Sequence, residues 1–338
     1  MTEPRPDPQI PEADADRRLA TDHGDILATL AKADHRFLAR DWRGAGAFYG
    51  AVGKLAGQGA ALPPAELLRA RDAALWLDGR FAEMLLEGLD RAGLTRAQRH
   101  PRFQLSLDIM LGRIPRNPPR ERFPQVPLTY YYPGTAYCQF ADAGQFDWAE
   151  PITAATEAIR TEAERLMAED GAFQPYVTAT TGRPQGDVHG LLDNRDWSTW
   201  QLTEKGEAVP DRVARCPLTW ASVADHAPLC RVLNRAPTAM FSLLRPRSRI
   251  APHTGMLNTR LICHLPLIVP PGCGFRVGSE TRQWRAGELM VFDDTVEHEA
   301  WNDSASDRLV LIFDVWRPDI GEVERDQIAT LFRVVDEG

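Results

Sequence analysis

The stretch TRLICHLPLIV, residues 259–269, is the longest of a series of short apolar runs that decide the fold of this chain. The others are TAMFSLL (238–244), GFRV (274–277), ELMVF (288–292), HEAWN (298–302) and RLVLIFDVW (308–316). Period-two patterning and turns rich in Pro, Gly and Asp predict that each run is a strand. Short strands in succession, without helices between them, predict an antiparallel sandwich or barrel with its core at 237–318. A last amphipathic helix is predicted over 323–335.

Residues 15–113 have a different pattern, with apolar residues at helical spacing among many Ala, Leu and Arg. Two pieces can be aligned, LARDWRGAGAFYGAV (38–52) and LWLDGRFAEMLLEGL (75–89), and each is interpreted as a small-residue turn between two helices. The offset between them is close to the period of tetratricopeptide repeats. The pattern predicts either a tetratricopeptide-like domain or a plain helical bundle, without a catalytic constellation.

Two proline-rich segments complete the expected organisation. Residues 1–14 are polar and lack the apolar core of a secretory signal, so they are expected to be disordered. Residues 114–134 have a proline every few positions and are expected to form a linker, because proline cannot continue a helix or a central strand. A jelly-roll domain then follows over 135–338. The predicted class is α+β: a C-terminal double-stranded β-helix (jelly-roll, cupin-like) preceded by an α-helical, tetratricopeptide-like domain.

The composition and net charge exclude some classes of binding partner. Hydrophobic residues make up 43% and charged residues 25% of the chain, as in soluble globular proteins. The formal net charge of −8 argues against a general nucleic-acid or anionic-membrane surface. No apolar run approaches the ~20 residues of a spanning helix. The five cysteines are scattered without a CxxC pair, which predicts reduced thiols and a cytoplasmic location.

Histidines within the strand region indicate a metal site. His253 is expected in a turn between two strands, and His298 at the start of another. Imidazole is the commonest protein ligand for iron, and two neighbouring strands can deliver two of them to one edge of a metal. Arg308 opens the next strand, and a guanidinium inside a barrel needs an anion because it keeps its proton. A carboxylate, bound through two hydrogen bonds, meets that need.

The segment 240–318 resembles the aspartyl/asparaginyl β-hydroxylase family. The motifs that carry the resemblance are FSLLRP, HTGMLNTRLICHLPLIVPPGCGFRVG, ETRQWRAGELMVFDDTVEHEAWN and RLVLIFDVWRP, and weaker similarity reaches back through NRDWSTWQL. The resemblance implies an oxygenase that uses iron(II), 2-oxoglutarate and O2. It also implies that His253 and His298 bind the iron. The helical N-terminal part is loosely similar to the tetratricopeptide-like region that precedes the catalytic domain in some members.

Further roles are implied residue by residue. Arg308 would bind the distal carboxylate of 2-oxoglutarate with help from the Ser242 hydroxyl. His264 and Trp197 match positions that contact the cosubstrate. Arg260 matches a basic residue that faces the acidic side chain of the substrate. The family commonly has a second arginine two positions later, where this chain has Ile262.

Glycine occupies the place of the third metal ligand. Oxygenases of this class commonly use an H-x-D/E…H ligand set, whereas this chain has His253-Thr254-Gly255. Three alternatives remain open: water fills the position, as the resemblance implies, Asp294 reaches the metal, or a halide binds, as in iron halogenases. A turn containing Asp293 and Asp294 would also commonly hydrogen-bond its own backbone.

The expected function is therefore iron(II)- and 2-oxoglutarate-dependent hydroxylation of an unactivated carbon. The resemblance favours the β-carbon of an Asp or Asn residue in a peptide or protein. The alternatives are a free amino acid, a small metabolite or a lipid acyl chain as substrate, or a cupin-like protein that binds without turnover. The oligomeric state does not follow from the sequence.

Overall fold

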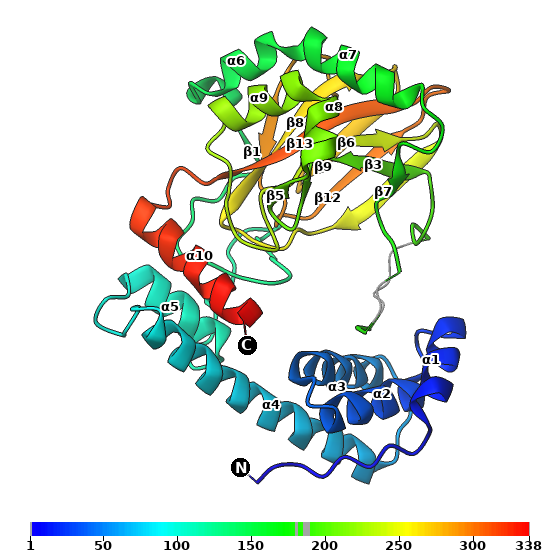
Figure 1. Ribbon diagram of the computed structural model, residues 1–338, viewed down its shortest axis with the longest axis vertical. Coiled ribbons are helices and arrows are strands. Elements are labelled where there is room, and N and C mark those ends of the chain that lie inside the picture. The colour runs from blue at the N-terminus through cyan, green and yellow to red at the C-terminus, as the bar shows by residue number, and fades with distance from the viewer. Residues whose placement is uncertain (1, 180–181, 185–189, 338) are drawn as a thin grey trace. The chain divides into compact units, whose positions relative to one another are not determined.

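The computed structural model describes residues 2–179, 182–184 and 190–337 (Figure 1). Their contacts form two compact units. One comprises the described residues of 1–88 and 178–188, and the other those of 89–177 and 189–338. The boundary lies inside one helix and not in the predicted linker. None of the helices in the described part of the chain is both long enough and apolar enough to cross a membrane.

The first unit is helical. It contains α1 (Glu12–Thr21), α2 (Ile26–Leu38), α3 (Trp42–Gly57) and most of α4 (Pro64–Arg91). Aspartate side chains cap α2 and α3 by accepting hydrogen bonds from backbone N–H groups, as expected of this residue type at N-caps. The buried apolar residues of α2, α3 and α4 form one core: Ile26, Leu30, Ala33, Phe37, Ala45, Phe48, Tyr49, Val52, Ala70, Ala73 and Leu77.

The second predicted helical repeat is wrong. The turn expected within LWLDGRFAEMLLEGL does not form, because α4 is one continuous helix of 28 residues through Gly79. A single glycine costs a helix only about 1 kcal/mol relative to alanine, which the surrounding Ala, Leu, Glu and Arg residues outweigh. The first pair, α2 and α3, has the predicted turn. Helix α1 begins at Glu12, so the last residues of the segment expected to be disordered are helical.

Among the described residues, the second unit contains two main antiparallel sheets and a short two-stranded one, formed by β4 (Thr203–Glu204) and β5 (Glu207–Ala208). The larger has the order β1 (Phe140–Ala141), β11 (Met290–Phe292), β8 (Arg260–Ile268), β13 (Arg308–Trp316), β6 (Ala239–Leu244), β3 (Trp197–Gln201), β2 (Gln174–Pro175). The smaller has the order β10 (Glu280–Arg282), β9 (Cys273–Val277), β12 (His298–Asn302), β7 (Ser248–His253). From β6 to β13 successive strands alternate between the sheets, except that β9 and β10 are hairpin neighbours. This interleaving is a double-stranded β-helix and confirms the predicted α+β jelly roll.

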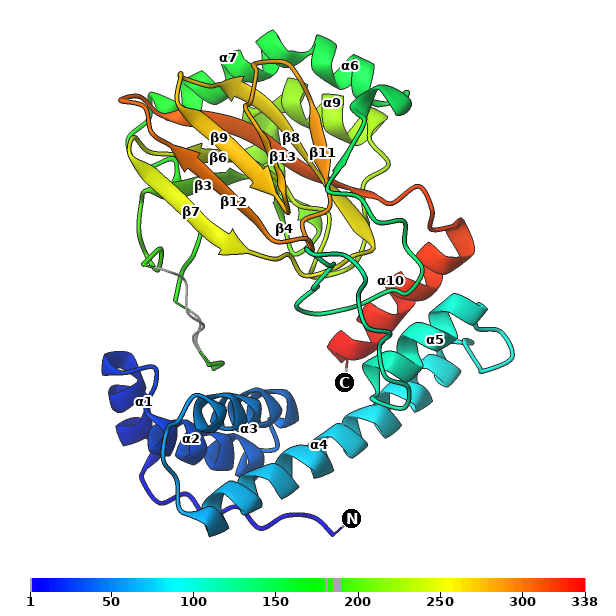
Figure 2. The same ribbon diagram turned by 180° about the vertical axis from the view of Figure 1, so that it is seen from behind.

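Alternation along the strands of the larger sheet separates two cores. One set of side chains packs between the sheets with residues such as Phe275 and Val277 of the smaller sheet. The other set packs against helices α6 (Ala149–Ala154), α7 (Thr156–Met167) and α9 (Pro217–His226), which cover the outer face (Figures 1 and 2). Because side chains alternate along a strand, every second residue of β8 and β13 faces the barrel interior.

The predicted strands of the C-terminal third are confirmed, with two strands missed: β7 and the three-residue β10. Residues 248–253 lie outside the predicted runs, and His253 is expected in a turn, but these residues form β7, which pairs with β12. The run SRIAPH is unusual for a strand because it contains an arginine and a proline. Strand β7 lies at the edge of its sheet, where both residues are tolerated. His253 is therefore the last residue of a strand.

The predicted linker is not an open connection. Gln125 forms an isolated bridge with Val296, and Tyr130 forms one with Leu257. The Tyr132 backbone N–H donates to Asn258 Oδ1 at 2.7 Å. The second half of residues 114–134 therefore packs against the barrel, where its backbone finds partners despite the prolines.

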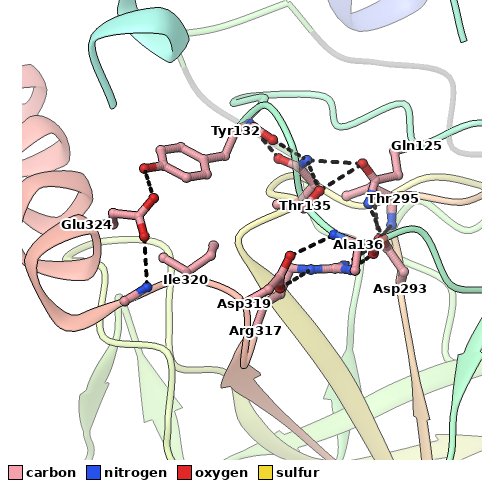
Figure 3. A network of polar contacts seen from close by, with 12 residues as sticks. Gln125, Tyr132, Thr135, Ala136, Asp293, Thr295, Arg317, Asp319, Ile320 and Glu324 are labelled. Carbon is pink, nitrogen blue, oxygen red and sulfur yellow. Dashed lines mark hydrogen bonds and ion pairs between the residues drawn. The ribbon is translucent and has the colours of Figure 1, made fainter. Parts of the chain in front are cut away.

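A polar network joins this segment to the barrel and to α10 (Glu322–Glu337), as Figure 3 shows. Asp293 lies at its centre, fully buried, and accepts from Arg317 Nη1 at 2.8 Å and from Gln125 Nε2 at 2.6 Å. It also accepts from Thr295 N at 3.0 Å, which confirms the expected turn role of this aspartate. At the edge of the network, Tyr132 donates to Glu324 of α10 at 2.7 Å. The network fixes the turn that leads to His298.

We expect Arg317→Met to lower the free energy of unfolding by about 3–5 kcal/mol, because it leaves the buried Asp293 carboxylate without its cation. The matched control is Arg249→Met, whose pair with Asp303 is solvent-exposed and should contribute about 0–1 kcal/mol. Urea unfolding followed by tryptophan fluorescence measures both. Equal losses for the two variants would contradict the role given to the network.

Candidate active site

The two predicted iron ligands lie opposite one another on neighbouring strands. His253 ends β7 and His298 begins β12, and the antiparallel register pairs them directly. Their ring centroids are 4.1 Å apart, with the ring planes inclined at 53°. The structure thus brings together two imidazoles that are 45 positions apart in the chain, which is the arrangement that two ligands of one metal need.

Backbone carbonyls orient both rings. His253 Nδ1 lies 2.8 Å from Ala251 O, and His298 Nδ1 lies 3.0 Å from Val296 O. A carbonyl can only accept, so Nδ1 carries the proton in each ring and Nε2 keeps the lone pair that binds a metal. Burial and the neighbouring His253 lower the pKa of His298 to about 3. His298 is therefore neutral at physiological pH, as metal binding requires.

Arg308 is a buried cation that lacks a carboxylate partner within the described residues. It is 1% exposed, and its Nε and Nη2 atoms have no hydrogen-bond partner there. The guanidinium carbon lies 4.7 Å from the ring centroid of Trp284. Burial lowers the pKa of Arg308 to about 10, so the side chain remains charged at neutral pH. A buried unpaired charge is costly, and an anionic ligand would satisfy this one.

Three other predicted cosubstrate residues surround this cation. Ser242 and His264 belong to β6 and β8, which pair with β13 on its two sides. The Ser242 hydroxyl accepts from Trp197 Nε1 at 3.1 Å. His264 Nδ1 is buried without a partner in the described part of the chain. Burial and the charge of Arg308 hold the pKa of His264 well below its usual value, so this ring is neutral.

Arg260 has a different environment from the one expected. It is 7% exposed and forms ion pairs with Asp314 and with Asp294, the latter at 3.2 Å. Burial opposes its charge, but attraction by the two carboxylates raises the pKa of Arg260 further. Two internal carboxylates already balance the charge of this guanidinium through its two Nη atoms, and only Nε lacks a hydrogen-bond partner among the described residues. The geometry therefore does not favour the substrate-binding role predicted for Arg260.

Steric crowding explains why position 255 is a glycine. A side chain there would collide with the carboxylate of Asp294, since an added Cβ would lie well inside contact distance of its Oδ2 and Cγ. Gly255 N donates to the Asp294 carbonyl at 2.6 Å, which holds the two segments together. The Asp294 carboxylate thus occupies the space into which a ligand at position 255 would project.

This observation bears on the three alternatives for the third ligand. Within the described residues, no group of three or more His, Cys, Asp or Glu side chains could hold a metal. Asp294 is directed to Arg260, while its Oδ1 has no hydrogen-bond partner in the described residues. A carboxylate at this place repels a halide and can accept from a water molecule.

Sequence reasoning assigned no role to Tyr176 or Trp284. The Tyr176 ring lies 4.3 Å from that of Trp197, which in turn lies 6.3 Å from His253. Trp284 packs under Arg308. Trp284 falls within the motif ETRQWRAG and could have been found by its place in the family resemblance. Tyr176 comes from a segment without strand periodicity and carries no such signal.

We expect Gly255→Ala to cost about 1–3 kcal/mol of stability because the new methyl group overlaps the Asp294 carboxylate. Asp294→Ala on its own removes one partner of Arg260. The double variant should then be destabilised by less than the sum of the two single changes. Urea unfolding of the four proteins measures this coupling, and strict additivity would show that the two residues do not compete for one space.

Comparison with known proteins relates this site to a family. Residues 153–318 match the profile described as Aspartyl/Asparaginyl beta-hydroxylase. The chain is 34% identical over 187 residues to the mouse protein of that name, covering 54% of this chain and 25% of the relative. It is 32% identical over 180 residues to the ornithine lipid ester-linked acyl 2-hydroxylase of Rhizobium tropici, covering 52% of this chain and 60% of the relative.

The likeness to solved structures is low. A predicted oxalate decarboxylase from Thermotoga maritima has a TM-score of 0.24 and 16% identity, over 36% of this chain and 81% of that one. A cupin 2 conserved barrel domain protein from Salinispora arenicola has a TM-score of 0.24 and 9% identity, over 43% and 87%. At these scores the structures add nothing to the fold described above. The sequence comparisons bear out the predicted resemblance: residues 153–318 of this chain match the aspartyl/asparaginyl beta-hydroxylase family.

Proposed function

We propose that this protein is an iron(II)- and 2-oxoglutarate-dependent dioxygenase that hydroxylates an unactivated carbon. The observation that carries the proposal is Arg308, a buried cation on the inner face of the barrel for which the described residues supply no anion. The paired imidazoles of His253 and His298 suit a metal with two protein ligands. The named hydroxylase relatives support the same reaction class.

Each residue has a proposed task. His253 and His298 would hold the iron through Nε2, and Arg308 and Ser242 would bind the distal carboxylate of 2-oxoglutarate. His264 and Trp197 would line the cosubstrate. When bound, iron(II), 2-oxoglutarate and O2 supply the oxidative chemistry. The protein contributes orientation through the backbone carbonyls behind each imidazole and exclusion of water by the aromatic residues around Arg308.

The substrate is a separate part of the proposal. The names of two relatives point to aspartyl or asparaginyl residues and to a lipid acyl chain. The match spans only a quarter of the mouse relative and 60% of the bacterial one, so neither substrate transfers directly. A peptide or protein substrate, with the helical unit acting as a tetratricopeptide-like docking region, remains our working proposal. The scattered thiols support a cytoplasmic location.

The direct experiment is anaerobic loading with iron(II), followed by addition of O2 and 2-oxoglutarate and measurement of succinate. We expect uncoupled succinate formation by the wild-type protein and a loss of at least ~100-fold in His298→Ala, which removes half of the protein ligands. Iron binding, measured separately by metal analysis after gel filtration, should fall in the same variant. If the wild type forms no succinate and the iron content of His298→Ala is unchanged, the proposal that this protein is a dioxygenase is refuted.

Arg308→Met tests the cosubstrate site with two readouts. The KM for 2-oxoglutarate should rise by ~10–100-fold, the equivalent of about 1.5–3 kcal/mol for hydrogen bonds to a charged group. The stability of the ligand-free protein should not fall, because the substitution removes an unpaired buried charge. Arg249→Met, on an exposed pair, is the control and should change neither quantity. A large loss of stability in Arg308→Met without a change in KM would make Arg308 a structural residue.

A further inference from the structure

The inner face of the two central strands carries charge only at its ends. On β8 the inward residues run from Arg260 through Ile262 to His264, and on β13 from Arg308 through Val310 and Ile312 to Asp314. The strands are antiparallel, with Asp314 opposite Ile262 and Ile312 opposite His264. Arg308 therefore lies at one end of the interior, and Arg260 with Asp314 lies at the other, which we call the Arg260 end.

The Arg260 end lies beside the metal ligands. The Asp294 carboxylate, which pairs with Arg260, fills the space next to Gly255, two residues after His253. Tyr176 closes the other side. Its ring lies 4.3 Å from that of Trp197, and the residue is 40% exposed. The Trp197 ring lies 6.3 Å from that of His253, so both Asp294 and the Tyr176–Trp197 pair belong to the surroundings of this predicted ligand.

The Arg260 end has no cation without a carboxylate partner among the described residues. At the Arg260 end one guanidinium faces two carboxylates, which leaves one negative charge in excess. Bound iron(II) would add two positive charges and 2-oxoglutarate two negative ones, and Arg308 adds a further positive charge. The loaded interior is then neutral, and no cation within the described residues is left over for a substrate carboxylate.

The wall between the two ends is apolar. Ile262 is 7% exposed and packs in one cluster with Met240 and Ile312. It lies on the same face as Arg260 and His264, and its side chain can offer a substrate only a hydrocarbon contact. A carboxylate placed here would be desolvated beside Asp294 and Asp314 without a partner, which is strongly unfavourable.

We infer that the substrate group that binds at the Arg260 end carries no charge, so the enzyme takes an amide or aliphatic group and rejects a carboxylate. This inference rests on the proposed function and specifies its substrate class. It replaces the expectation that Arg260 binds an acidic side chain: Arg260 instead holds Asp294 and Asp314 in place beside the metal site.

The test uses three peptides of one sequence that differ only in a central Asp, Asn or Leu residue, with a neutral acyl amide as a fourth probe. Stimulated succinate formation is measured with the iron-loaded full chain. Stimulation by one or more uncharged probes, at least ~10-fold above that by the Asp peptide, is expected because like charges disfavour the carboxylate. Stimulation by the Asp peptide equal to that by the best uncharged probe would overturn the inference, and so would stimulation by none of the uncharged probes.

A binding measurement separates this inference from the proposed function. Trp197 fluorescence, calibrated with Trp197→Phe, is followed as the Asp and Asn peptides are added to the protein without iron. Weaker binding of the Asp peptide than of the Asn peptide is expected, whether or not succinate is ever formed. Tighter binding of the Asp peptide would overturn the inference while leaving the oxygenase proposal intact. Absence of uncoupled succinate, with the binding order as expected, would reject the oxygenase alone.

Ile262→Arg provides the gain-of-function test, with Ile262→Leu as the control of matched volume. The arginine variant adds the missing cation, so the ratio of stimulation by the Asp peptide to that by the Asn peptide should rise by at least ~10-fold. The leucine variant should keep the wild-type ratio. If the arginine variant does not fold, the peptide series with the wild type still decides the question. An unchanged ratio in a folded Ile262→Arg variant would contradict the inference.

Discussion

Strand β13 lies between β6 and β8, and the alternation of its nine residues sets both the core and the candidate site. One set of its side chains, Leu309, Leu311, Phe313 and Val315, packs under the covering helices. The other set points between the sheets, where Arg308 and Asp314 mark the two ends. The pleat therefore places a cation and a carboxylate at opposite ends of one interior while it buries the apolar residues that hold the sheet. A slip of one residue in register would exchange the two faces and destroy both.

The buried arginines of the barrel differ in whether the chain supplies a carboxylate partner. Arg317 and Arg260 each have carboxylate partners from the chain itself, and such pairs fix local structure more than they add net stability. Arg308 has none within the described residues. A ligand-binding residue must remain incompletely satisfied until its ligand arrives, and the ligand-free fold bears that cost. The presence or absence of a carboxylate partner among the described residues distinguishes the candidate binding residue from the structural ones.

The Asp294 carboxylate occupies the space that a side chain at position 255 would need, close to the predicted metal ligands. The carboxylate that fills this position comes from the turn before β12 and not from β7. The turn is in turn held by Asp293, which accepts from Arg317, Gln125 and Thr295. Two consecutive aspartates thus have different roles. Asp293 belongs to the polar network at the end of the barrel, and Asp294 lies at the candidate metal site.

The sequence by itself determined the jelly roll and the positions of its main strands, because period-two patterning is a local signal. Family motifs also predicted His253, His298, Arg308 and Ser242 as members of one candidate site. It failed at β7, whose polar edge sequence resembles a loop, and at the second helical repeat, where one glycine was not enough to end α4. Only the tertiary structure decided the partners of each charge. Arg260 and Arg308 are both inward-facing strand arginines, and nothing local distinguishes them. The difference arises because Asp294 and Asp314 approach Arg260 from other strands and turns, and electrostatic pairing depends on distance in space rather than on position in the chain.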